Sequence, residues 1–283
     1  MSSEGVQDAA TVEGFGREWS TFDQSALDES DLRRIFEDYF ALFPWADLPQ
    51  DARGADIGCG SGRWAQFVAP RVGHLLCVDA SEEAVAVAKR KLQTLPNAEV
   101  RQGMAGALDI EHGSLDFAYS LGVLHHTPDP EAALRDCVDV LKPGAPFLLY
   151  IYYAFDNRPA WFRSLWRVTD ALRRVISSRP FRQRYWISQA IACVVYWPLA
   201  RAARMLELVR LPPGAVELVP LAFYRDKPFY VLRNDALDRF GTKVEHRFTQ
   251  AQMRTLMESA GLTDIEFAET APFWVAVGRR ATA

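Results

Sequence analysis

The stretch Gly54-Ala55-Asp56-Ile57-Gly58-Cys59-Gly60-Ser61-Gly62-Arg63-Trp64 decides the fold of this chain. A short strand runs into an acid, glycines follow at every second position, and a helix then begins. Glycine is needed where a backbone turns tightly or where a ligand approaches with no Cβ in the way. The order of strand, glycine loop and helix therefore predicts a ligand-binding turn in an α/β sheet.

The spacing of the glycines and two acids narrows the class of ligand. The dinucleotide fingerprint is GxGxxG, whereas this loop reads GxGxG, with Asp56 two residues before Gly58. An acid at that place would repel a pyrophosphate, and it suits a ligand that bears an ammonium group. Asp79 follows Gly58 by 21 residues, at the end of the next expected strand, where an acid can accept both hydroxyls of a ribose. A glycine turn that binds nothing is the alternative, and the two acids argue against it.

Outward from this stretch, short apolar strands alternate with helices. Such alternation predicts an α/β fold with a doubly wound, mostly parallel sheet. The last two strands are joined by a turn at Pro272 and should pair antiparallel, which gives seven strands with one antiparallel strand. The expected strands are residues 54–57, 74–78, 98–102, 115–120, 147–152, 264–268 and 273–278.

The alternation is interrupted after the fifth strand, so we expect a discontinuous core. Residues 51–153 and 243–283 form the Rossmann-like core, residues 154–242 a mainly helical insertion, and residues 1–50 an N-terminal helical cap. Expected helix starts lie at Ser81, at Asp129 before a proline, and at the capping box of Thr249.

Composition is that of an ordinary globular protein, with 283 residues of which 49% are hydrophobic. The start of the chain does not resemble a signal peptide, and the longest apolar run, residues 190–200, is too short to span a bilayer. The four cysteines show no metal-ligand spacing, so we expect no metal site and a reducing, cytoplasmic location.

Three segments resemble class I S-adenosylmethionine-dependent methyltransferases. Residues 56–62 look like their first motif, residues 114–130 like their fourth-strand motif, and residues 141–145 like the turn before strand five. The resemblance covers roughly residues 50–153 and 249–280. It implies a methyl transfer that consumes S-adenosylmethionine and leaves S-adenosylhomocysteine.

The resemblance also implies which residues hold this cofactor. Asp56 and the glycine loop would seat the methionine portion, Asp79 the ribose, and the backbone of Ser120 and Leu121 the amino-acid end. One departure is that the family usually has an acid after strand three to bind the adenine amino group. In its place Met104 should pack on the adenine while the backbone at Ala105 reads its edge. The full expected set is Asp56, Gly58, Cys59, Gly60, Gly62, Arg63, Asp79, Ala80, Met104, Ala105, Ser120 and Leu121.

Candidate bases lie beyond the carboxyl ends of the strands, where ligands bind in open α/β sheets. His126 is the strongest candidate, followed by His125 and Tyr153. The alternative is structural, because a His-His-x-Pro-Asp turn is frequent in this superfamily with different acceptors and can simply order the loop.

The insertion is expected to provide acceptor specificity. Residues 155–211 contain eleven arginines and no lysine against three acids, a net charge of about +8. An arginine- and aromatic-rich segment of this kind fits a substrate lid over an anionic, amphipathic or lipid-like small molecule, a peripheral membrane contact, or an oligomer interface. A solvated arginine face is the simplest alternative. No nucleic-acid partner is expected, because no motif supports one.

Two rival functions stay open from sequence. A nicotinamide-dependent oxidoreductase shares the strand-loop-helix order, although Asp56 and the loop spacing argue against it. A non-catalytic S-adenosylmethionine-binding protein would share every cofactor residue. N-terminal aromatics, Phe15, Trp19 and Phe22, could close over the cofactor or pack against the insertion.

Overall fold

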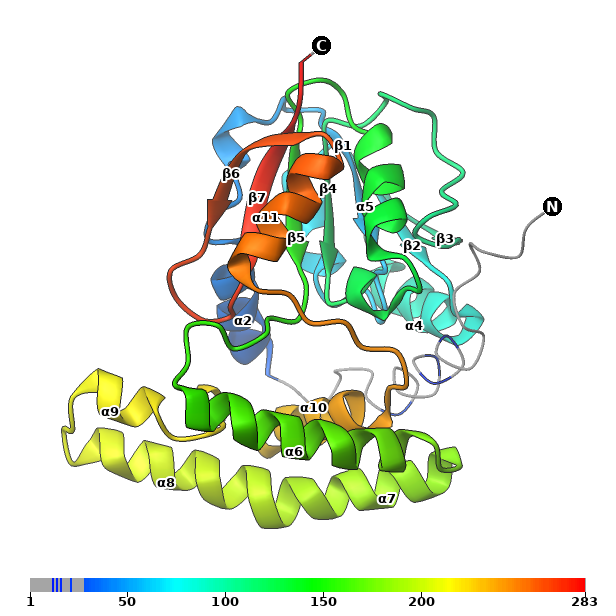
Figure 1. The fold of residues 1–283 in the computed structure, drawn as a ribbon. Coiled ribbons are helices and arrows are strands. Elements are labelled where there is room, and N and C mark those ends of the chain that lie inside the picture. The colour runs from blue at the N-terminus through cyan, green and yellow to red at the C-terminus, as the bar shows by residue number, and fades with distance from the viewer. Residues whose placement is uncertain (1–11, 13, 15, 17–20, 22–27, 283) are drawn as a thin grey trace. The chain divides into compact units, whose positions relative to one another are not determined.

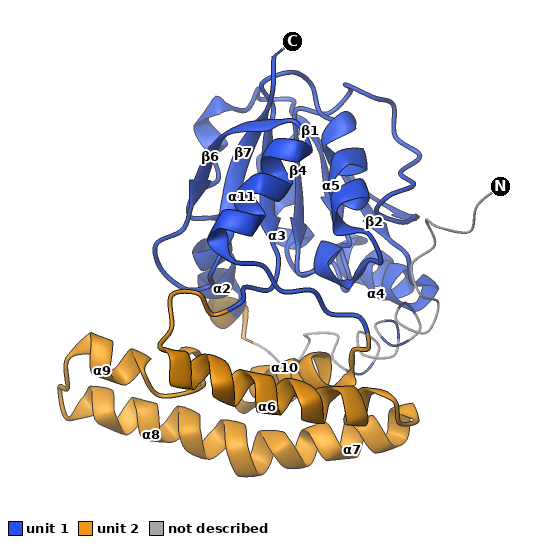
Figure 2. Cartoon of the chain, in the orientation of Figure 1, with its two compact units in different colours: residues 1–24, 32–154, 244–283 blue, residues 25–31, 155–243 orange. Residues whose placement is uncertain are grey.

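The computed structural model describes residues 12, 14, 16, 21 and 28–282 and divides into two compact units (Figure 2). Unit 1 holds residues 1–24, 32–154 and 244–283, and unit 2 holds residues 25–31 and 155–243. Residues 32–50, which belong to the expected N-terminal helical cap, fall in unit 1 with the core residues. Phe15, Trp19 and Phe22 lie outside the described residues.

Unit 1 is built on a seven-stranded sheet with strand order β3-β2-β1-β4-β5-β7-β6 (Figure 1). β7 is antiparallel to both of its neighbours, and the other pairs are parallel, which confirms the expected α/β fold. The strand order reverses between β1 and β4, the position where open α/β sheets bind ligands. The strands are β1 Arg53–Ile57, β2 His74–Asp79, β3 Ala98–Gln102, β4 Phe117–Leu121, β5 Pro146–Tyr150, β6 Leu262–Phe267 and β7 Val275–Arg280.

Helices cover both faces of this sheet. On one face, α5 (Pro130–Asp139) and α11 (Gln250–Ser259) pack on the apolar side chains of β1, β4 and β5. The other face carries α2 (Glu29–Phe40) and α3 (Ala65–Val68), where the Phe36 and Phe67 rings lie 5.1 Å apart. α4 (Glu82–Leu92) contacts α3, β2 and β3. Short 3-10 turns occur at Trp45–Asp47, Ala69–Arg71 and Leu124–His126.

The expected helix starts form as the sequence indicates. The Ser81 side chain accepts a hydrogen bond from the Ala84 N–H, and Asp129 accepts from the next turn at the start of α5. Thr249 and Gln252 form both halves of the capping box of α11. These caps fix the helices that follow the strand ends, and so they fix the loops where the site lies.

Unit 2 is a helical bundle with its own apolar core, formed by α6, the α7–α8 region and α10. α7, η4 and α8 follow one another without a break, so residues 181–208 form one continuous helix. η4 is a π turn, and it lies just before Pro198, which has no N–H to donate to the preceding turn. The elements are α6 Ala160–Ser177, α7 Phe181–Ile191, η4 Ala192–Tyr196, α8 Trp197–Leu208, α9 Pro213–Glu217, η5 Ala222–Tyr224 and α10 Phe229–Gly241.

One arginine of the insertion has a structural role within unit 2. Arg173 is buried, pairs with Asp170 at 2.8 Å, and donates hydrogen bonds to the carbonyls of Thr242 and Lys243. It therefore joins α6 to the end of α10 and does not belong to an exposed arginine face. None of the described helices is long and apolar enough to cross a membrane.

Candidate functional site

The glycine loop leaves β1 at the point where the strand order reverses. Gly58, Gly60 and Gly62 all have positive φ, at 80°, 53° and 73°. A Cβ on Gly58 would lie 2.3 Å from the Val123 side chain, so only glycine fits there. The Gly58 N–H donates to the Val78 carbonyl at 2.7 Å, which ties the loop to β2.

Asp56, the last acid of β1, is buried with unused hydrogen-bonding capacity. Its side chain is 1% exposed, and within the described residues its Oδ2 has no hydrogen-bond partner. Burial raises the pKa of Asp56 to about 7; the neighbouring Tyr119 hydroxyl and Arg63 lower the pKa, and Asp79 raises it further. A buried carboxylate of this kind favours a cation as its partner.

Asp79 closes β2 and holds the glycine loop. Its two oxygens accept hydrogen bonds from the Gly60 N–H at 2.8 Å and from the Ser81 N–H at 2.9 Å. Burial raises the pKa of Asp79, and these two backbone donors counteract part of the rise. The side chain stays half-buried, so each oxygen has a lone pair left for a hydroxyl donor. Gly16 adjoins this corner, since a Cβ on it would lie 2.4 Å from Ser81 Oγ.

The end of β4 borders the same crossing point. β4 pairs with β1 only as far as Tyr119, so the backbone of Ser120 and Leu121 lies beyond that ladder on the β1 side. The Ser120 hydroxyl donates to the Ile57 carbonyl at 2.9 Å, and the Leu121 side chain is buried. At the end of β4, a ligand would therefore meet the backbone groups of Ser120 and Leu121 and not their side chains.

The expected adenine-binding residues lie in the loop after β3. The Gly103 N–H donates to the Asp79 carbonyl at 2.9 Å, so Met104 lies one residue beyond a backbone hydrogen bond to Asp79. Met104 and Ala105 are both half-buried. The carboxylate of Asp136 on α5 accepts hydrogen bonds from two backbone N–H groups of this loop and so fixes its course.

The remaining expected cofactor residues surround the loop in different ways. The Arg63 guanidinium lies 4.4 Å from the centre of the Trp64 ring. Cys59 is buried, and the neighbouring Cys77, together with burial, raises the pKa of the Cys59 thiol well above its usual range. Ala80 is half-buried beside Asp79. Among the described residues, no group of histidines, cysteines and acids is arranged to hold a metal.

The two histidines lie together, with Tyr152 beside them. The His125 ring centre is 3.9 Å from that of His126 and 4.0 Å from that of Tyr152. His125 is fully buried, and neither ring nitrogen has a partner within the described structure. Burial, with the charges of His126, Arg247 and His246 adding to it, holds the pKa of His125 well below its usual range. His125 is therefore neutral at pH 7.

His126 is oriented by the backbone. Its Nδ1 lies 2.6 Å from the Val244 carbonyl oxygen, which can only accept, so Nδ1 carries the proton. In the neutral ring of this tautomer, Nε2 is the nitrogen that can accept a proton.

Tyr153, the third expected catalytic residue, is directed elsewhere. Its ring lies 5.7 Å from that of Phe273 and packs against the α5–α11 core. It is the ring of Tyr152, not that of Tyr153, that contacts the histidines, at 4.0 Å from His125 and 5.6 Å from His126.

Sequence reasoning missed an ion pair beside the histidines. Glu245 and Arg247 pair at 2.7 Å with almost no exposure of either side chain, and the Arg247 guanidinium lies 4.9 Å from the centre of the Tyr152 ring. Their segment runs beside the histidine turn, with the His246 N–H donating to the His125 carbonyl. The sequence shows Glu245-His246-Arg247, but no local pattern of residues indicates that the Glu245 and Arg247 side chains are buried.

Comparison with known proteins agrees with this geometry. Residues 55–149 match the family model described as "Methyltransferase domain". The chain is 36% identical over 96 residues to the ubiquinone biosynthesis O-methyltransferase of Marinobacter nauticus, covering 32% of this chain and 40% of that protein. It is 33% identical over 123 residues to the uncharacterized methyltransferase YcgJ of Bacillus subtilis, covering 43% and 49%. The alignments span less than half of these relatives.

The fold of nearly the whole chain also resembles solved structures. One is a chain of the Haloferax volcanii complex between the Trm112 methyltransferase activator and a methyltransferase, with a TM-score of 0.50, 14% identity, and 95% and 98% coverage. Another is a Bordetella parapertussis protein, with a TM-score of 0.53, 16% identity, and 99% and 81% coverage. Residues 55–149 of the core are therefore similar in sequence to a methyltransferase domain, and nearly the whole chain has the fold of these solved structures. These similarities favour a methyltransferase over the alternative of a nicotinamide-dependent oxidoreductase.

Proposed function

We propose that this chain transfers the methyl group of S-adenosylmethionine to a small or lipid-like acceptor, with the insertion forming the acceptor pocket. The observation that carries the proposal is the buried Asp56 carboxyl with a partnerless oxygen beside three positive-φ glycines. A cationic amino-acid headgroup would satisfy that oxygen, whereas a pyrophosphate would be repelled.

The residues present fit this cofactor. Asp56 and the glycine loop would hold the methionine portion, the free lone pairs of Asp79 the ribose hydroxyls, and the loop at Met104 and Ala105 the adenine. The cofactor supplies a methyl group on a positively charged sulfur, which a nucleophile attacks in line. The chain's contribution is to orient that attack and to exclude water.

Within this scheme His126 is the proposed base. The Val244 carbonyl holds the ring in the tautomer that leaves Nε2 as the acceptor of a proton from the substrate. Tyr152 and the neutral His125 pack against it and restrict its rotation. His125 is better suited to positioning than to proton transfer, because its lowered pKa makes it a weak base. Tyr153 has no part in this proposal.

The insertion is the proposed source of acceptor specificity for a topological reason. It leaves the core after Ala154, just past β5, and returns at Val244, whose carbonyl contacts His126. His126 thus contacts Tyr152, three residues before the insertion begins, and Val244, the first residue after it. Relatives named for ubiquinone biosynthesis support an acceptor with a hydroxyl on a lipid-like molecule.

The test uses methyl-labelled S-adenosylmethionine and an extract of the source cells. We expect a labelled small molecule or lipid and an equal amount of S-adenosylhomocysteine, both lost in Asp79→Asn, which keeps one acceptor oxygen for the loop. Binding of the cofactor with no S-adenosylhomocysteine from any extract would favour the non-catalytic alternative. No cofactor binding at all would overturn the proposal.

A further inference from the structure

The continuous helix formed by α7, η4 and α8 has an apolar face that the described chain leaves open. Val194, Met205 and Leu208 on this helix are 71%, 66% and 67% exposed. The opposite side buries Ala192, Tyr196 and other residues in the core of unit 2. The apolar face consists of Trp186, Ile187, Val194, Val195, Trp197, Met205, Leu208 and Val209.

The first part of this face carries no charge, because residues 185–200 contain no acid and no base. Arg182 and Arg184 precede this part, and Arg201 and Arg204 follow it, between Trp197 and Met205 of the same face; the Arg201 guanidinium lies 4.1 Å from the centre of the Trp197 ring. Soluble proteins rarely expose a contiguous apolar surface of this kind unless it binds something.

A second stripe of the same character lies on α6. Trp161, Leu165, Val168, Leu172 and Val175 are all exposed, at spacings of four and three residues that place them along one side of the helix. Two successive helices of one unit thus each combine an exposed apolar stripe with tryptophan.

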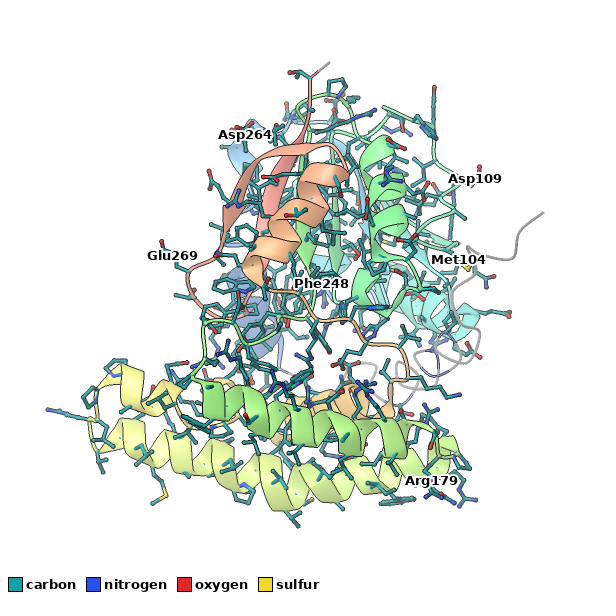
Figure 3. The ribbon with its side chains drawn as sticks, viewed as in Figure 1. Met104, Asp109, Arg179, Phe248, Asp264 and Glu269 are labelled. Carbon is teal, nitrogen blue, oxygen red and sulfur yellow. The ribbon has the colours of Figure 1, made fainter. Side chains whose placement is uncertain are left out.

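The charge around these stripes is of a single sign. Residues 157–206 contain ten arginines and one acid, Asp170, which is already paired with Arg173 and Arg174. Four further arginines are exposed, and no described carboxylate lies within ion-pairing distance of them. They are Arg163, Arg167, Arg179 and Arg182 (Arg179 is labelled in Figure 3).

We propose that the apolar face of the α7–α8 helix docks on a lipid bilayer that contains anionic phospholipid. Interfacial helices combine an apolar face, tryptophan and basic flanks, which enter the headgroup region and attract anionic lipid. Because the other side of this helix is packed in unit 2, the helix can lie along a membrane surface without crossing it.

The charges around the apolar face argue against two other binding partners, a second copy of this chain and a nucleic acid. A second copy docked by the same face would place arginines against arginines around a two-fold contact. A nucleic acid would satisfy the arginines but would leave the uncharged part of the face, residues 185–200, without a partner. An anionic bilayer satisfies both, since its acyl region receives the apolar side chains and its headgroups receive the arginines.

The experiment measures binding of the full chain to vesicles by co-sedimentation. One set contains equal phosphatidylglycerol and phosphatidylcholine, and the other contains phosphatidylcholine alone. We expect at least tenfold stronger binding to the anionic set at low salt, weakened by 0.5 M salt. Val194→Glu with Met205→Glu should reduce binding at least tenfold, because it places carboxylates in the face. Leu218→Glu, at an exposed apolar position outside the helix, is the matched control and should change binding less than twofold.

Both substituted side chains are exposed, so circular dichroism and cofactor affinity should match the unsubstituted protein. The docking surface does not depend on methyl transfer, and its failure would leave the proposed function intact. The proposal is overturned if neither vesicle set binds, or if the glutamates leave vesicle binding unchanged. It is also overturned if the glutamates instead disperse a dimer seen by sedimentation, or abolish binding to an RNA or DNA probe while no vesicles bind.

Discussion

Asp56 and His126 each contribute one atom to the proposed reaction site. For Asp56 this atom is Oδ2, which is buried and has no hydrogen-bond partner among the described residues. For His126 it is Nε2, because Nδ1 donates to the Val244 carbonyl. Asp56 can therefore bind a cation, and His126 can accept a proton. Each proposed role can be tested by replacing the side chain with a neutral one of similar size.

Asp56→Asn should stabilise the cofactor-free protein at pH 8 and have little effect at pH 4. The folded-state pKa of about 7 lies above the ordinary 3.8, so the folded protein binds the extra proton and loses stability as pH rises between these values. The full shift corresponds to about 4 kcal/mol, and we expect about 2 kcal/mol because the amide stays buried. Urea unfolding at the two pH values measures the difference.

The same substitution should weaken S-adenosylmethionine binding and flatten its pH dependence. In the unsubstituted protein, affinity should be about tenfold lower at pH 6 than at pH 8, since a proton competes with the ammonium group for Asp56. Calorimetry at both values would contradict the assignment of Asp56 if the unsubstituted protein bound equally at each.

His126→Gln should lower methyl transfer to the natural acceptor by about 100-fold with cofactor affinity unchanged, because removal of a general base typically costs this much. Tyr153→Phe, three residues past the end of β5, is the matched control, and we expect a change of less than threefold. A rate with His126→Gln within threefold of the original would show that the histidine turn only orders the loop.

At the scale of elements, the site depends on how helices begin after strands. α4 begins three residues past Asp79, and its N-cap Ser81 also donates its N–H to that carboxylate. α11 follows the segment that carries the Glu245–Arg247 pair, and the capping box at Thr249 fixes where that segment stops. The caps therefore position functional loops as well as stabilise helices.

Thr249→Ala should destabilise the protein by about 1 kcal/mol, the usual effect of losing an N-cap. The hydroxyl accepts from the Gln252 N–H at 3.2 Å, so Thr249→Ser should retain most of the stability. Thr255→Ala, in the exposed interior of the same helix, is the control and should be neutral or slightly stabilising. Equal losses at both threonines in thermal melts would show that the cap has no special role.

At the scale of the whole molecule, the core is closed without the insertion. Tyr153 and Phe248 form a parallel bridge, and the Ala154 N–H donates to the Phe248 carbonyl at 2.8 Å. The two ends of the insertion are thus held by hydrogen bonds that lie entirely in unit 1. Unit 2 has its own apolar core and its own buried ion pair.

Replacing residues 156–242 with a short glycine-serine linker should therefore leave S-adenosylmethionine binding within about threefold, because every proposed cofactor residue lies in unit 1. Transfer to the acceptor should be lost. Asp79→Asn in the shortened chain is the control and should abolish binding. A shortened chain that folds by circular dichroism but does not bind the cofactor would show that the insertion takes part in cofactor binding.

The sequence by itself determined the sheet, its one reversed strand, the helix caps and the glycine loop, because each depends on residues close together in the chain. Tertiary structure alone decided that Arg173 is buried and that Tyr152, not Tyr153, meets the histidines. Only the tertiary structure places Glu245 and Arg247 beside the histidines. Only the tertiary structure leaves one face of the α7–α8 helix exposed. Burial and long-range pairing depend on segments far apart in the chain, and no local pattern of residue types reports which segments meet.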